Sequence, residues 1–322
     1  MSTSLLNNFL ENVFTKIYEN LYENYKGLTQ NPKWLLMRKV ARFQIGRAIM
    51  LFFFKRSSQS YLTFINESNS CFGETNLDIA VNQLKTEGLY LNINLPQEMV
   101  QEIINFAKST VCYGNRKSNL GFYYHQKEQV EKKLKKHFTT GNYFNTGLLC
   151  PAIKKLQNDP LLLAIAARYL DTQPVHQGNH LWWSFAGKAT YHEQSQAAQF
   201  FHYDMDDYRF VKFFFYLTDV DETSGPHVCV RGSHKKKKLS HLCLRKRETD
   251  KDIIAYYGLD SLVKICGKAG FGFVEDPLCF HKGIPPTHKD RLILQIEFAT
   301  TDYNMQHDIR ETSLLKCIEE LM

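Results

Sequence analysis

The spacing of apolar residues along the sequence changes near residue 181, and this change limits the folds that the chain can adopt. Before it, apolar residues recur every three or four positions, a spacing typical of amphipathic helices. After it, short aromatic and β-branched runs alternate with turns, as in 181–185, 210–217, 272–274 and 291–298. Helices followed by strands indicate an α+β protein whose C-terminal part is an antiparallel sheet or barrel.

The first part of the chain has a pattern of its own. Apolar spacing predicts an amphipathic helix over residues 5–25, and a second, basic helix is expected after Pro32. The polar stretch 57–74 is typical of a linker. We therefore predict two parts, a helical N-terminal extension over 1–75 and a larger domain over 76–322.

The net charge of +7 comes from two local patches. Residues 33–56 and residues 235–247 each carry seven Lys or Arg and no acid, and the rest of the chain has a net charge of −7. Such localised charge, without a nucleic-acid motif, argues against nucleic-acid binding. Residues 33–56 either pack on the body of the protein or contact an anionic membrane peripherally. Residues 235–247 form either a solvated loop or a surface for an anionic, carrier-linked substrate.

The cysteines and the N-terminus bear on the compartment. The eight cysteines include no C-x-x-C pair, and Glu11 and Glu19 interrupt the N-terminal apolar pattern, which disfavours a secretory signal. The apolar stretch 48–54 is far shorter than the roughly 20 residues that span a bilayer. We expect a reduced, cytoplasmic protein.

The pattern that points to chemistry is His202-Tyr203-Asp204. In a strand, residues i and i+2 share a face, so His202 and Asp204 can bind one cation. His281, 79 residues downstream, can supply a second imidazole. Two histidines and one carboxylate that leave coordination positions open are typical of non-heme Fe(II) oxygenases. Arg291 begins an apolar run, and a guanidinium buried there could bind a dicarboxylate.

Other readings of these residues stay open. A hydrogen-bonded strand pair without metal is the alternative for His202 and Asp204. His288-Lys289-Asp290 lies in a polar loop and is expected to be a solvated turn, and His234 is expected to be a structural turn residue. The remaining histidines considered are interpreted as surface or loop residues: His192, His227 and His241. Nearby aromatic residues suggest a largely apolar pocket: Trp182, Trp183, Phe201, Phe213 and Phe215.

Taken together, these segments resemble the phytanoyl-CoA hydroxylase-like family of Fe(II)- and 2-oxoglutarate-dependent dioxygenases. The resemblance covers roughly 77–300, where Gly88-Leu89-Tyr90 and the helix at Pro96 look like the family's first strand and helix. The elements in the family's order and spacing are Phe201-His202-Tyr203-Asp204, Gly225-Pro226, Gly232-Ser233-His234-Lys235, and His281-Lys282-Gly283 through Arg291. Two residues depart from the pattern: Arg231 replaces a proline, and Gly283 replaces a serine that helps to hold 2-oxoglutarate in many members.

The resemblance implies a double-stranded β-helix, a jelly-roll or cupin-like barrel flanked by helices. It implies Fe(II) bound by His202, Asp204 and His281, 2-oxoglutarate anchored by Arg291, and O₂ as the second cosubstrate. Related halogenases have Gly or Ala in place of Asp204, so this carboxylate favours hydroxylation.

We therefore expect a dioxygenase that hydroxylates an unactivated C–H of a small or carrier-linked substrate, with release of succinate and CO₂. The alternative is a non-catalytic, metal-binding barrel that acts as a binding or membrane-associated module.

Overall fold

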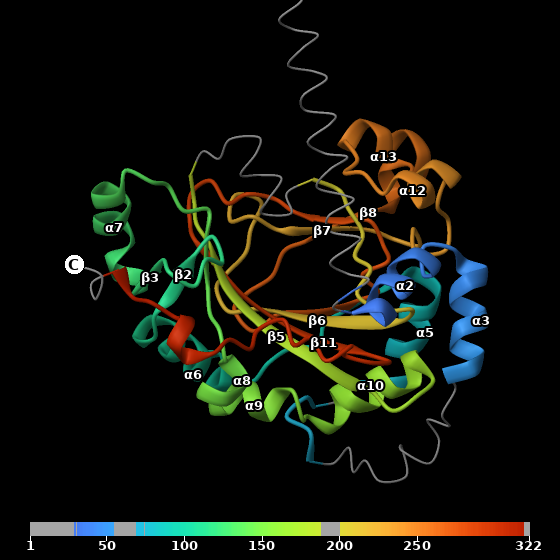
Figure 1. Cartoon of the computed structure of the whole chain (residues 1–322), viewed down its shortest axis with the longest axis horizontal. Coiled ribbons are helices and arrows are strands. Elements are labelled where there is room, and N and C mark those ends of the chain that lie inside the picture. Colours follow the sequence, from blue (N-terminus) through green and yellow to red (C-terminus); the bar gives the residue numbers. More distant parts are fainter. Residues whose placement is uncertain (1–28, 30, 55–68, 74, 188–199, 319–322) are drawn as a thin grey trace, which may run out of the picture.

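The computed structural model describes residues 29, 31–54, 69–73, 75–187 and 200–318 (Figure 1). The helix predicted over 5–25 and most of the linker predicted over 57–74 lie outside the described residues. Two antiparallel sheets, one large and one small, make up the centre of the described fold, and helices pack around them (Figure 1).

The large sheet has eight strands in the order β1-β9-β6-β11-β5-β4-β2-β3. Their bounds are β1 Leu89–Leu91, β2 Cys112–Gly114, β3 Gly121–Phe122, β4 Thr140–Asn142, β5 Val175–Ser184, β6 Phe210–Tyr216, β9 Gly272–Glu275 and β11 Arg291–Ala299. The small sheet has the order β10-β7-β8, with bounds β10 His281–Gly283, β7 His227–Val230 and β8 Leu262–Ile265.

Side-chain caps mark the start of some of the helices around this body. Asn76 caps α5, and Asp159 accepts two backbone N–H bonds at the start of α10, which has Pro160 at its first position. The α-helices are α2 Pro32–Val40, α3 Gln44–Phe54, α5 Leu77–Glu87, α6 Gln97–Ser109, α7 Lys127–Leu134, α8 Thr146–Leu149, α9 Pro151–Leu156, α10 Pro160–Leu170, α12 Leu239–Leu244 and α13 Asp250–Tyr257. Three short 3₁₀ turns are η2 Tyr124–Gln126, η3 Leu259–Ser261 and η4 Thr312–Leu314.

The two faces of the large sheet have different surroundings. Along β11, the even-numbered residues Leu292–Phe298 pack against helices α5, α6, α9 and α10 in the main core. The odd-numbered residues Arg291, Ile293, Gln295 and Glu297 line a cavity between the two sheets. The strand period of two therefore assigns alternate residues to the core and to the cavity.

The fold class expected from the sequence is confirmed: helices and two facing antiparallel sheets form an α+β, jelly-roll-like body. The sheets are not closed into one continuous barrel in the described part of the chain. An isolated antiparallel bridge between His202 and His281 lies beside the small sheet. This bridge is also where the candidate site begins.

The two basic segments pack on the body in part. In residues 33–56, Met37 and Ala41 are fully buried in a second core cluster, whereas Phe52 and Phe53 are 77 % and 75 % exposed. In residues 235–247, the Lys237 ammonium lies over the ring of Phe280 at 4.7 Å. No helix in the described ranges is long and apolar enough to cross a membrane.

Candidate active site

The structure brings the imidazoles of His202 and His281 together through their backbones. His202 N–H donates to the His281 carbonyl at 3.0 Å, and His281 N–H donates back at 2.8 Å. Residues exchanging both bonds are directly opposite each other, and here their rings meet edge to face with centroids 4.4 Å apart. Two histidines 79 residues apart thus become neighbours.

Asp204 completes the group that the sequence analysis singled out. Its two carboxylate oxygens lie 3.6 Å from His202 Nε2 and 3.6 Å from His281 Nε2. One potential ligand atom from each of the three residues lies within 4.8 Å of the others. The Asp204 backbone N–H is bonded to the Pro277 carbonyl at 2.8 Å, which fixes the chain beside His281.

The hydrogen bonds of the rings leave the correct nitrogen for a metal. His202 Nδ1 lies 2.9 Å from the Phe200 carbonyl, and His281 Nδ1 lies 3.0 Å from the Cys279 carbonyl. A carbonyl only accepts, so each Nδ1 carries a proton, and Nε2 is the nitrogen left to bind a metal. Two imidazoles and a carboxylate with this orientation fit the facial donor set of a non-heme Fe(II) site.

The charge states of His202 and Asp204 suit the same role. Burial, followed by repulsion from His281, lowers the pKa of His202 to about 3, so this imidazole is neutral. Burial acts to raise the pKa of Asp204, but the positive charge of Lys212 and the two imidazoles outweigh it and lower that pKa. A neutral imidazole and an ionised carboxylate are the forms that bind metals. For His281, burial acts to lower the pKa, but Glu275 and Asp204 outweigh it and raise that pKa to about 9, so a metal ion has to displace its proton.

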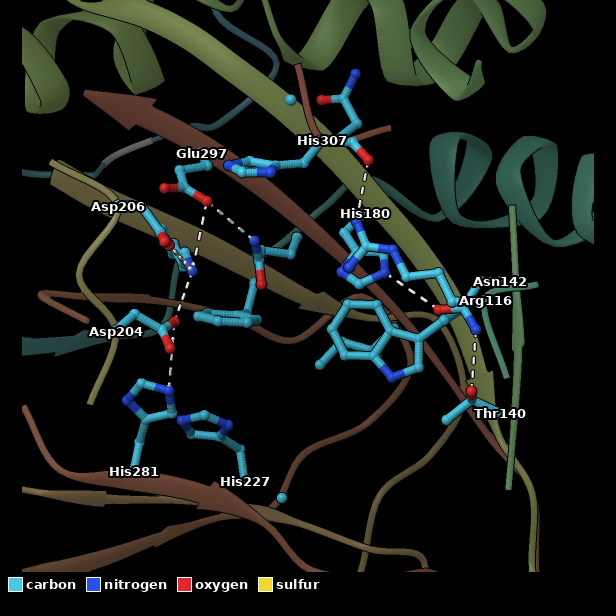
Figure 2. A pocket seen from close by; sticks show the side chains of 18 of the residues that line it. Arg116, Thr140, Asn142, His180, Asp204, Asp206, His227, His281, Glu297 and His307 are labelled. Carbon is cyan, nitrogen blue, oxygen red and sulfur yellow. Dashed lines mark hydrogen bonds and ion pairs between the residues drawn. The ribbon is translucent and has the colours of Figure 1, made fainter. Parts of the chain in front are cut away.

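A buried lysine that the sequence analysis missed holds Asp204 in place. Lys212 Nζ lies 2.7 Å from Asp204, 3.2 Å from Asp206 and 3.4 Å from Glu297 (Figure 2). Its only signal in the sequence is that it stands alone as a charge in the apolar run Phe210–Tyr216. Glu297 is likewise the one acid in β11, and the two residues are paired in the sheet register.

His281 also has a buried acidic neighbour. Glu275 lies 3.2 Å from His281 Nδ1 and 2.6 Å from His227 Nε2. Burial acts to raise the pKa of Glu275, but the two histidines outweigh it and lower that pKa to about 2. Glu275 is therefore hydrogen-bonded to His227, and its other oxygen, Oε1, is a charged neighbour of His281 without a hydrogen bond of its own.

Arg291 lies at the start of β11 and is 5 % exposed. Its Nη2 donates to Ser184 Oγ at 3.0 Å, its Nη1 donates to the Gly225 carbonyl, and its Nε has no partner. No carboxylate lies within 4 Å of it among the residues that the structure describes. A buried guanidinium in this situation is ready to receive an anionic ligand.

Gly283 lies beside Arg291, where many relatives have serine. A Cβ at position 283 would be 3.7 Å from Arg291 Nη2, so the missing serine leaves open space rather than a rearranged backbone. Ser184, paired with Arg291 in the sheet register, places its hydroxyl against the same nitrogen. A hydroxyl from β5 thus lies beside the guanidinium of Arg291.

One cavity of about 420 Å³ is lined by all four predicted site residues, of which Figure 2 labels Asp204 and His281. His202, Asp204 and His281 lie at one part of its lining, and Arg291 also lines it. The four residues share this cavity although the sequence separates them by up to 89 positions.

The prediction of a largely apolar pocket is wrong. Of the five aromatic residues named for it, only Trp182 is part of the cavity lining. Trp183, Phe213 and Phe215 point to the opposite face of the large sheet and are buried in the main core, and Phe201 belongs to the second core cluster. The lining is instead rich in charged, amide and imidazole side chains.

The expectations for the other histidines are partly wrong. His227 is 7 % exposed and His241 is 4 % exposed, so neither is a surface residue. His227 lines the cavity because β7 turns it toward Glu275. His288 is exposed in a loop, as expected, and His192 lies outside the described residues.

Comparison with known proteins identifies the family. Residues 95–291 match the family described as Phytanoyl-CoA dioxygenase (PhyH). The match spans more than half of the chain, and the chain therefore belongs to this family. Enzymes of the family use Fe(II), with 2-oxoglutarate and O₂ as cosubstrates, on small molecules. The family and the cofactors expected from the sequence are confirmed.

Solved structures with a related fold were also found. EvdO2 from Micromonospora carbonacea var. aurantiaca, complexed with 2-oxoglutarate, is 13 % identical with a TM-score of 0.49, over 71 % of this chain and 92 % of that chain. The epimerase SnoN, in complex with Fe³⁺, α-ketoglutarate and nogalamycin RO, is 15 % identical with a TM-score of 0.45, over 69 % and 82 %. The carbocyclase SnoK from nogalamycin biosynthesis is 14 % identical with a TM-score of 0.44, over 70 % and 86 %. No curated protein matches the chain.

Proposed function

We propose that this chain is an Fe(II)- and 2-oxoglutarate-dependent dioxygenase that hydroxylates an unactivated C–H bond of a small molecule. The observation that carries the proposal is one cavity that contains two adjacent imidazoles, an ionised carboxylate and a buried arginine without a carboxylate partner in the described residues. In this proposal His202, Asp204 and His281 bind the metal, and Arg291 binds the distal carboxylate of 2-oxoglutarate.

The overall reaction balances as R–H + 2-oxoglutarate + O₂ → R–OH + succinate + CO₂. Bound Fe(II) supplies the activation of O₂ that this conversion needs. The side chains of the protein position the reactants: Arg291 and Ser184 hold the cosubstrate at one end, and Lys212 keeps the Asp204 carboxylate oriented. Asp204 supports hydroxylation rather than halogenation, since it fills a position that a halide would need.

Four finer predictions from the sequence stay predictions. The boundary near residue 75 stays a prediction, and so does the peripheral membrane contact through 33–56. The exposed Phe52 and Phe53 on a helix without acidic residues are compatible with an anionic surface. A carrier-linked substrate and the cytoplasmic location are likewise predictions.

Succinate formation tests the proposed function without knowledge of the substrate. With Fe(II), labelled 2-oxoglutarate and O₂, we expect slow formation of labelled succinate, because these enzymes oxidise the cosubstrate when no substrate is bound. Asp204→Asn is expected to lower the rate about 100-fold, since it removes the anionic metal ligand. Mass spectrometry of succinate measures both rates.

A matched control is Asp219→Asn, because Asp219 is an exposed aspartate paired with Lys268 outside the cavity. This variant should keep the wild-type rate. Wild-type levels of succinate from Asp204→Asn, or none from a wild-type protein that binds both Fe(II) and 2-oxoglutarate, would favour the non-catalytic binding module.

A further inference from the structure

The side of the cavity that faces Asp204 and His281 has a distinct lining. Figure 2 shows Arg116, Thr140, Asn142 and His180 across the cavity from Asp204 and His281. These residues come from strands β4 and β5 and from the turn after β2. None of them has a part in holding iron or the cosubstrate in the proposed function.

Arg116 is the lining cation that has no assigned anion. Three Lys or Arg side chains line the cavity in the described part of the chain: Arg116, Lys212 and Arg291. Lys212 already has three carboxylates within 3.4 Å, and Arg291 is assigned to 2-oxoglutarate. Arg116 donates from Nη2 to the His307 carbonyl at 3.0 Å, and no described carboxylate lies within 4 Å of it.

The backbone at Arg116 has a conformation that is energetically unfavourable for a residue with a side chain. Asn115 and Arg116 have φ angles of 50° and 61°, and Lys117 N–H bonds to the Gly114 carbonyl at 3.1 Å. This is a tight turn with two left-handed residues, in which glycine is strongly preferred at the position of Arg116. The Asn115 side chain holds the turn by accepting from Thr139 N–H at 3.0 Å. A strained arginine that reaches a cavity points to a functional side chain.

A chain of hydrogen bonds orients the polar groups next to Arg116. His180 Nε2 donates to Asn142 Oδ1 at 3.1 Å, and Asn142 Nδ2 donates to Thr140 Oγ1 at 2.9 Å. The Thr140 hydroxyl is therefore left to donate, and His180 Nδ1 is left to accept. Burial, with the nearby charges of Arg116 and Lys212, lowers the pKa of His180, so its ring is neutral.

Glu297 places a buried carboxyl group in the same cavity, nearer to Asp206 and Asp204 (Figure 2). Its side chain is 3 % exposed, and Oε2 lies 3.4 Å from Lys212. The other oxygen, Oε1, has no hydrogen-bond partner in the described structure. A buried oxygen without a partner is costly, and a donor group on a bound ligand would remove that cost.

We propose that this side of the cavity binds a small hydrophilic substrate with an anionic group, a carboxylate or a phosphate, paired with Arg116. Its hydroxyl or amine groups hydrogen-bond to Thr140 and His180 on that side and extend toward the Glu297 carboxyl group nearer to Asp204. The inference rests on the proposed function, because it names the substrate class of the same site. A cavity of about 420 Å³ shared with 2-oxoglutarate is small, at the low end of the roughly 300–1,000 Å³ range of ligand pockets. It favours such a molecule over a long acyl chain.

Three small probes test the charge requirement: glycerol 3-phosphate, glycerate and glycerol. Each is titrated by calorimetry into anaerobic protein with Fe(II) and saturating 2-oxoglutarate. We expect at least one charged probe to bind about tenfold more tightly than glycerol, because a guanidinium–anion pair is stronger than a neutral hydrogen bond. The charged probe that binds identifies the group as phosphate or carboxylate.

Variants then assign the preference to Arg116. Arg116→Gln should weaken the charged probe about tenfold and change 2-oxoglutarate affinity less than about twofold. Arg116→Gly should lose the same binding but keep the wild-type melting temperature, because glycine relieves the turn while one hydrogen bond is lost. Arg231→Gln is the matched control, since Arg231 pairs with Glu87 outside the cavity.

The outcomes separate this inference from the proposed function. If 2-oxoglutarate binds but neither charged probe binds better than glycerol, or if Arg116→Gln binds them as wild type does, the inference is wrong. If 2-oxoglutarate does not bind to the wild-type protein while a charged probe binds through Arg116, the proposed function is wrong and the anion site stands.

Discussion

Replacing His281 with alanine is expected to weaken Fe(II) binding about 100-fold or more, and His202→Ala should have a similar effect. Each change removes one of only three protein ligands. Removing a residue that hydrogen-bonds to a ligand typically lowers metal affinity about 10–100-fold, and removing the ligand itself is expected to lower it more. Anaerobic titration of Fe(II), followed by equilibrium dialysis, gives the dissociation constants. His288→Ala is the matched control, because His288 is an exposed loop residue in the second His-x-Asp triplet.

Unchanged Fe(II) affinity in both His202→Ala and His281→Ala would contradict the assignment of the metal site. Loss of Fe(II) affinity in His288→Ala alone would indicate that the metal binds at His288-Lys289-Asp290 instead. Far-ultraviolet circular dichroism should show that the variants keep the fold, since the two histidines are joined by backbone hydrogen bonds that alanine preserves.

The second large effect is expected at Arg291. Arg291→Ala should raise the dissociation constant of 2-oxoglutarate about 100-fold, because it removes a buried charge-assisted pair. Arg291→Lys should raise it about tenfold, since an ammonium does not reproduce the planar fork of the guanidinium. Calorimetry with anaerobic Fe(II)-loaded protein measures these constants.

A smaller change beside Arg291 serves as the comparison. Ser184→Ala removes the hydroxyl that contacts Nη2 but keeps the guanidinium, so the expected loss is only about fivefold. Fe(II) affinity should be unaffected in all three variants. If Arg291→Ala binds 2-oxoglutarate as tightly as the wild-type protein, another cation anchors the cosubstrate.

The residues named for the site could be predicted because local rules place them. His202 and Asp204 are two positions apart in an extended segment, and this spacing alone puts them on one side. The helix starts at Pro32 and Asp159 are similarly local.

Other residues of the site depend on how distant strands are aligned. Lys212 and Glu297 are 85 positions apart, and only the register of β6 with β11 makes them partners. Arg116 enters the cavity through a tight turn whose neighbour, β4, comes after α7 in the chain. Such pairings have no local signal in the sequence. They depend on the strand register, and a register shift of one residue would move every side chain of a strand to the other face of the sheet.

The wrong prediction of an apolar pocket has an instructive cause. In β6, aromatic residues occupy both faces, so apolar character alone does not say which face is the cavity. The lone charge of Lys212 indicates which face of β6 lines the cavity, because a charged side chain is tolerated in the cavity and not in the core. Phe214 shares that face and lines the cavity, whereas Phe213 and Phe215 lie in the core.

The visible absorption band of an Fe(II)–2-oxo acid chelate tests the central claim most directly, because it requires the metal site and the cosubstrate site at once. We expect the band to develop when 2-oxoglutarate is added to anaerobic wild-type protein with one equivalent of Fe(II). It should be absent from His281→Ala, and Arg291→Ala should require much higher 2-oxoglutarate to produce it. No band from the wild-type protein, or a band of wild-type strength from His281→Ala, would contradict the account.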